Sequence, residues 1–169
     1  MERIAQFEKV SCEQFFKDWQ DKFPDASEKI IFSIYDGISL PKRATAGSAG
    51  YDFFLPSDIS LAAGESIVIP TGIRAKISDG WVLNLYPRSG LGFKYRLQLD
   101  NTVGIIDSDY YNSANEGHIM AKITNDGKSG KALYLEAGKG FIQGIFMPFG
   151  ITVDDSADGE RIGGFGSTG

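Results

Sequence analysis

A short run near the middle of the chain places two carboxylates and a tyrosine directly after apolar residues. The run, Gly104 to Tyr110, reads GIIDSDY. Strict strand alternation would put Asp107 and Asp109 on one face and Tyr110 on the other. The Ser-Asp pair favours a turn, however, and a turn would bring Asp107 and Tyr110 into one pocket. Alone, such a run is most typical of a solvated hairpin turn, so its interpretation depends on other polar segments.

A second polar segment separates two strand-like runs. Arg88, Ser89 and Gly90 offer a guanidinium, a hydroxyl and backbone amides, which are groups that hold phosphate oxygens. An ordinary turn after Pro87 is the simpler alternative. The segment by itself does not decide between the two.

The C-terminal residues 161–169 set a few functional side chains among glycines: Arg161, Phe165, Ser167 and Thr168. The segment is not a Walker A loop, because it lacks the Gly-Lys-Ser/Thr ending and the helix that would follow. An aromatic ring among glycines is suited to stacking on a flat ligand. A floppy terminus without a function is the alternative.

Two more polar residues stand in otherwise apolar runs. Asp52 must bond to backbone or lie near a cation, because burying an unpaired carboxylate is costly. Gln143 is either a satisfied core amide or a donor to a ligand. His118 and Cys12 are the single histidine and the single cysteine of the chain, which argues against an internal disulfide, a zinc site and a Ser/His/Asp triad.

Composition excludes several classes of protein. The 169 residues suggest one domain. A net charge of −5 argues against a nucleic-acid partner, although local arginines and a metal ion could still bind a phosphorylated small molecule. No apolar run approaches the roughly 20 residues of a membrane span. The N-terminus lacks the apolar core of a signal peptide, so we expect a cytoplasmic protein.

The hydrophobic pattern predicts one helix followed by many short strands. Ser11 and Gln14 resemble a capping box, and aromatic residues follow at helical spacing over residues 12–22. From residue 30 the pattern changes to short, glycine-punctuated runs. About ten strands with frequent turns predict an all-β, jelly-roll-like barrel. The expected strands include residues 30–35, 66–70, 72–77, 81–86, 95–99, 119–124, 132–135 and 141–149.

Five segments, taken in this order, resemble the five motifs of the trimeric dUTPase family (deoxyuridine triphosphate nucleotidohydrolases). The similarity covers about residues 30–169, and the fourth segment matches only loosely. Singly the motifs are weak, but five in register are specific. The segments are Ala49 to Asp52, Pro87 to Leu91, Asn101 to Tyr110, Gly138 to Gln143 and Arg161 to Gly169.

This resemblance implies a reaction: dUTP and water give dUMP and pyrophosphate, with Mg²⁺ held by the phosphates and water. Asp107 matches the catalytic aspartate that activates the attacking water. The hairpin from Asn101 through Gly104 and Ile106 to Tyr110 would read uracil, with Tyr110 under the deoxyribose. The remaining implied substrate-binding residues are Arg88, Ser89, Gly90 and Gln143 on the phosphates, and Arg161, Phe165, Gly166, Ser167 and Thr168 in the tail.

The resemblance also implies an assembly. The chain would form a homotrimer with active sites between subunits, and the tail of one chain would close over the site of another. Asp52 would support the metal-water shell or the active-site backbone. We therefore expect an N-terminal extension over residues 1–29, a barrel over residues 30–155 and a flexible, glycine-rich C-terminal arm over residues 156–169.

The chain departs from the family pattern in three places. Residues 111–116 form an apparent insertion after Tyr110. Gly140 stands where the fourth motif usually carries an arginine. The N-terminal helix is extra, and its aromatic stripe is expected to pack on the body of the protein or on a neighbouring subunit.

Two other functions remain as alternatives. A dCTP deaminase, or a bifunctional deaminase-dUTPase, shares the fold, but Lys122 occupies the position of the deaminase's catalytic glutamate. A nucleotide-gated regulatory binding protein on the same scaffold would use the helix and the insertion in addition to catalysis.

Overall fold

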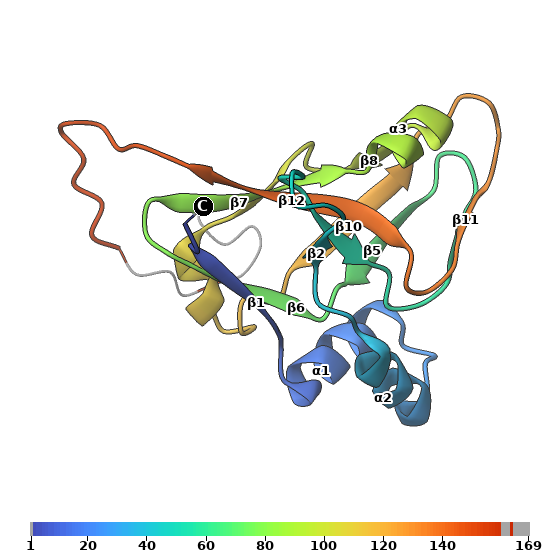
Figure 1. The fold of residues 1–169 in the computed structure, drawn as a ribbon. Coiled ribbons are helices and arrows are strands. Elements are labelled where there is room, and N and C mark those ends of the chain that lie inside the picture. The colour runs from blue at the N-terminus through green and yellow to red at the C-terminus, as the bar shows by residue number, and fades with distance from the viewer. Residues whose placement is uncertain (1, 160–162, 164–169) are drawn as a thin grey trace.

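The computed structural model describes residues 2–159 and residue 163, and its fold is all-β and jelly-roll-like, as predicted (Figure 1). Within the described residues, antiparallel strands form four sheets that do not close into one barrel. The largest sheet has the order β2-β3-β12-β7-β9, and β5-β10-β8, β1-β6 and β11-β4 form the others. The bounds are β1 Ala5–Lys9, β2 Lys42–Arg43, β3 Tyr51–Phe54, β4 Ile59–Leu61, β5 Ser66–Pro70, β6 Ile73–Ile77, β7 Trp81–Pro87, β8 Leu97–Leu99, β9 Gly104–Ile106, β10 Met120–Asn125, β11 Leu133–Leu135 and β12 Gly140–Pro148.

Strand β12 lies at the centre of the largest sheet, between β3 and β7. On the neighbouring strand β7, Leu83 and Leu85 are fully buried. Gly144 of β12 stands beside them, and a Cβ there would lie 2.8 Å from Leu83 Cδ1. The glycine therefore lets the central strand approach the core closely. This sheet carries four of the segments with candidate functional residues.

Helix α1 (Cys12–Lys22) confirms the predicted N-terminal helix. Ser11 is its N-cap, and the Ser11 hydroxyl accepts a hydrogen bond from the Gln14 backbone N–H at 3.0 Å. Only this half of the expected capping box forms, because the Gln14 side chain donates to Asp18 instead. Phe15 and Trp19 are buried against the body of the same chain, which resolves where the aromatic stripe packs.

The strand predicted over residues 30–35 is wrong: helix α2 (Glu28–Gly37) occupies this segment. The β-branched run has a strand-like composition, but its burial follows the helical period: Ile31 is buried, and Ile34 and Tyr35, three and four residues later, are half-buried. Packing of α2 against α1 thus overrides local propensity. The boundary expected after residue 29 falls inside α2.

Several other elements were not anticipated. Strand β1 lies within the expected N-terminal extension and pairs with β6 of the body, with Phe7 opposite Ala75. Helix α3 (Ser89–Tyr95) replaces the simple turn considered after Pro87. A short 3-10 helix, η1 (Ser108–Asn112), follows β9. No helix in the described part of the chain is long and apolar enough to cross a membrane.

Candidate active site

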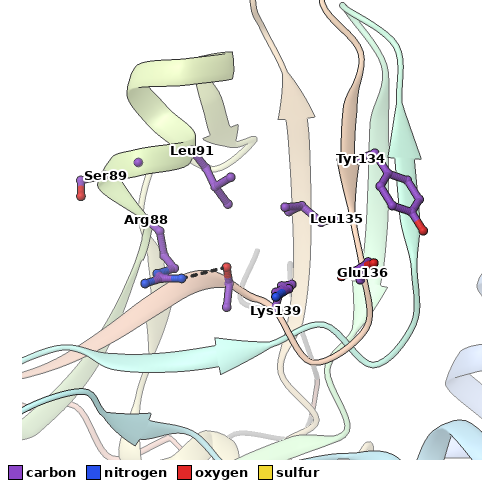
Figure 2. Close-up of a pocket in the computed structure, with 9 residues that line it drawn as sticks. Arg88, Ser89, Leu91, Tyr134, Leu135, Glu136 and Lys139 are labelled. Carbon is purple, nitrogen blue, oxygen red and sulfur yellow. Dashed lines mark hydrogen bonds between the residues drawn. The ribbon is translucent and has the colours of Figure 1, made fainter.

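A pocket of about 430 Å³ lies between the start of α3 and the segment that joins β11 to β12 (Figure 2). Two cationic side chains, Arg88 and Lys139, face it together with Glu136 and apolar groups. The lining residues are Arg88, Ser89, Gly90, Leu91, Tyr134, Leu135, Glu136, Lys139 and Gly140. The pocket therefore combines the predicted phosphate-binding residues of the second segment with residues of the fourth.

Arg88 is held in place from two sides. Its Nε lies 3.1 Å from Asp52 Oδ1, and its Nη1 donates to the Gly140 carbonyl at 3.2 Å (Figure 2). Asp52 therefore lies near a cation, one of the two environments expected for an acid among apolar residues. Because both contacts orient the guanidinium, Arg88 is positioned before any ligand arrives.

The absence of a side chain at position 140 is part of this arrangement. A Cβ on Gly140 would lie 2.8 Å from Arg88 Nη1 and 3.3 Å from its Cδ. An arginine at position 140 would therefore displace Arg88 from its observed position. Lys139, the neighbouring residue, supplies a second cation to the pocket. Sequence reasoning missed this lysine, although it lies within the quoted fourth segment.

Gln143 joins the first segment to the second. It lies opposite Asp52 of β3 and Tyr86 of β7, and its Nε2 donates to the Pro87 carbonyl at 3.4 Å. A Cβ on Gly50 would lie 2.6 Å from Gln143 Oε1, so the glycine makes room for this amide. The structure thus brings together the first, second and fourth segments around Arg88.

Asp107 lies elsewhere in the same chain and does not line the Arg88 pocket. It is exposed at the N-cap of η1, and the chain reaches it through β9, in which Gly104 and Ile106 are buried. Asn101 is exposed in the connection that precedes β9. The pairing of β9 with β7 places Ile106 opposite Leu83, which presents Asp107 at the end of a well-packed strand.

Tyr110 turns inward, away from the exposed position of Asp107. Its exposed fraction is 2%, and its hydroxyl donates to the His118 carbonyl at 2.7 Å. The Asn115 amide donates to the same hydroxyl at 2.8 Å. Because its own chain encloses the ring, the deoxyribose contact stays a prediction. The tail residues Arg161, Phe165, Gly166, Ser167 and Thr168 lie outside the described residues.

The position that distinguishes a deaminase carries an ion pair. Lys122 Nζ lies 2.7 Å from Asp100 Oδ2. The hydrogen bonds from Lys122 and Thr124 hold the pKa of Asp100 below its ordinary value. This site therefore presents a paired ammonium group where deaminase chemistry would need a carboxylate.

The fold and the site define a jelly-roll-like β protein with a cation-lined pocket suited to phosphate groups. The dUTPase family model matches residues 36–169. The chain belongs to the dUTPase family.

Similar proteins agree with this assignment. A deoxyuridine 5'-triphosphate nucleotidohydrolase of Lactococcus lactis is 45% identical over 136 residues, which are 79% of this chain and 89% of that protein. One from Tolumonas auensis is 42% identical, covering 80% and 91%. The crystal structure of a Streptococcus mutans dUTPase has a TM-score of 0.63 at 36% identity, covering 86% and 97%. A mutant dUTPase from phage phi11 of S. aureus, described with a structural Mg(II) ion, shares the fold at 18% identity and a TM-score of 0.63, covering 93% and 98%.

Proposed function

We propose that this chain hydrolyses dUTP to dUMP and pyrophosphate. The observation that carries the proposal is the Arg88 pocket, in which the second and fourth dUTPase-like segments meet and Arg88 is held by Asp52 of the first. Arg88, Lys139 and Ser89 offer charge and hydrogen bonds to a triphosphate. Phosphoryl-transfer catalysis depends mostly on positioning and charge stabilisation, which an anchored arginine supplies.

Asp107 is the proposed general base, which takes a proton from the water that attacks the α-phosphorus. Asp107 is exposed at the end of β9, in the N-cap position of η1. Since Asp107 and Arg88 do not share a pocket within one chain, we place each active site between subunits of a homotrimer. The segment after β12 extends from the body of the chain (Figure 1), and its apolar residues Phe149, Ile151 and Val153 are exposed, which supports a contact with another subunit.

Mg²⁺ is the proposed cofactor and would neutralise charge on the triphosphate. As the resemblance to dUTPases implies, the ion would be held by substrate phosphates and water. Asp52, beside the pocket through its contact with Arg88, is the carboxylate placed to support that water shell. The tail residues from Arg161 to Thr168 would close over the bound nucleotide, and the cytoplasm is the proposed location.

The test is pyrophosphate release with Mg²⁺ from dUTP, dTTP, UTP and dCTP in parallel. We expect selective release from dUTP, because close contacts around the base and sugar exclude the methyl and the extra hydroxyl. Equal release from dUTP and UTP would contradict the proposed sugar contact of Tyr110. Ammonia from dCTP, or no turnover of any nucleotide, would overturn the assignment as a dUTP hydrolase.

A further inference from the structure

The two parts of the chain that the dUTPase resemblance does not explain are in direct contact. The Ser11 N–H and the Ser11 hydroxyl each donate to the Glu116 carboxylate at 2.7 Å. The Tyr111 hydroxyl donates to Glu8 Oε2, also at 2.7 Å. The N-terminal segment is therefore bonded to the insertion that follows Tyr110.

A buried histidine adds a further contact between helix α1 and the residues that follow the insertion. His118 is fully buried, and its Nε2 accepts a hydrogen bond from the Gly72 N–H at 2.8 Å. The proton of the neutral ring must then be on Nδ1, which donates to Asp18 of α1 at 2.5 Å. Burial opposes ionisation of Asp18, but the hydrogen bonds from His118 and Gln14 outweigh it and lower its pKa. Asp18 thus accepts from His118 as a carboxylate.

Arg74 of β6 contacts both the N-terminal segment and the insertion. Its guanidinium lies 3.5 Å from the centre of the Tyr111 ring, in a cation–π contact. The same side chain lies within 3.9 Å of Glu8 and 3.8 Å of Glu116. One arginine therefore contacts both the N-terminal segment and the insertion.

The far side of the insertion encloses Tyr110. The Tyr110 hydroxyl donates to the His118 carbonyl and accepts from the Asn115 amide, and the Ser113 hydroxyl donates to the Tyr110 carbonyl at 2.7 Å. Gly117 has φ +70°, and a Cβ there would lie 2.7 Å from the same carbonyl oxygen. Tyr110 is three residues after Asp107, in the helix η1 that Asp107 caps. The insertion is therefore connected to the Asp107 loop through Tyr110.

We propose that the N-terminal segment and the insertion act as a brace that positions Asp107, with Asp18 as the principal positioning residue. This inference rests on the proposed role of Asp107 in dUTP hydrolysis. The apolar stripe of α1 is not open to another protein, because Phe15 and Trp19 are buried in the core of the same chain. Ser11 and Asp18 instead bond to Glu116 and His118, at the end of the insertion and just after it.

The brace should control turnover more than substrate binding. The Arg88 pocket contains none of the brace residues, so its phosphate contacts should remain when a substitution disrupts the brace. A shift of about 1 Å in a reacting group can cost about a hundredfold in rate. Loosening the brace is therefore expected to lower kcat and leave KM nearly unchanged.

The experiment compares Asp18→Ala, Asp18→Asn and Asp21→Ala. Asp18→Ala removes the acceptor of His118, whereas Asp18→Asn keeps an acceptor oxygen there. Asp21→Ala is the matched control, because Asp21 is on the same helix, is 69% exposed and pairs only with Lys22 among the described residues. The measurements are kcat and KM for dUTP, with sites counted by binding of a non-hydrolysable dUTP analogue, and hydrogen exchange of residues 104–118.

We expect Asp18→Ala to lower kcat per site about tenfold or more, to keep KM within about twofold, and to speed exchange across residues 107–118. Asp18→Asn and Asp21→Ala should resemble the wild type. An unchanged kcat per binding site in Asp18→Ala, even with fewer folded sites, would overturn the proposal. If Asp18→Ala does not fold, Ser11→Gly replaces it, since glycine is tolerated at an N-cap; it should show a smaller kcat loss, and wild-type kcat would contradict the brace. If the wild type does not turn over dUTP, the proposed function fails, while hydrogen exchange still decides whether the brace holds the loop.

Discussion

The Arg88 guanidinium lies against the β12 backbone at the position where Gly140 leaves space for it. Asp52 fixes its other side. A guanidinium held by a carboxylate and a carbonyl loses little freedom on binding phosphate, which favours affinity. The geometry of this one side chain thus depends on residues from three separate segments.

Gly140→Ala tests that dependence. The added Cβ would displace Arg88, so we expect KM for dUTP to rise about tenfold, the equivalent of one good charge-assisted hydrogen bond. Gly37→Ala, at the end of α2, is the control, because nothing lies within 4 Å of a Cβ at that position. If both variants show the same KM in steady-state assays, the position of Arg88 is not set by the glycine.

Residue types and spacing predicted several residues of the candidate site, but they did not predict how these residues are arranged. The motif order singled out Arg88, Asp52 and Gln143, which the structure brings together, whereas Asp107 lies apart from them and its role stays a prediction. The burial of Tyr110 could not be predicted in this way, because its partners lie outside the family motifs: Asn115 is in the insertion and His118 follows it. Lys139 was missed because a lysine beside a glycine carries no signal of a pocket until the fold brings it to Arg88.

At the scale of elements, local signals located α1 and failed for α2. Ser11 and the aromatic spacing mark the start and the buried face of α1, and both are local in sequence. Residues 30–35 have the composition of a strand, and only their packing against α1 makes them helical. Strand β1 likewise depends on a distant partner, β6, which no local pattern reveals.

The Asp18 contact makes the stability contributed by α1 dependent on pH. Its pKa in the folded protein is below the ordinary 3.8, so the ionised carboxylate stabilises the fold above that value and the stabilisation is lost as the pH falls through the lower pKa. The free energy of unfolding of the wild type should exceed that of Asp18→Asn near neutral pH. Urea unfolding from about pH 6 to about pH 3 should show this difference shrinking; a difference that grows toward acid pH would contradict the assignment.

For the whole molecule, the separation of Asp107 from the Arg88 pocket is the reason we propose that each site needs residues of two chains. Asp107→Asn and Arg88→Ala chains should each be nearly inactive alone. In trimers formed at random from equal amounts of both, about a quarter of the sites would combine an intact Asp107 with an intact Arg88 from another chain. Activity regained on mixing after joint refolding would support shared sites, whereas no recovery would mean that both residues act within one chain.

The most direct test of the account is pyrophosphate release from dUTP by Asp107→Asn beside the wild type, with binding of a non-hydrolysable dUTP analogue measured for both. Asparagine keeps the shape of the side chain and removes the base. We expect the variant to bind the analogue like the wild type and to lose at least about a hundredfold in kcat. Hydrolysis at the wild-type rate would contradict the role of Asp107 and, with it, the mechanism proposed here.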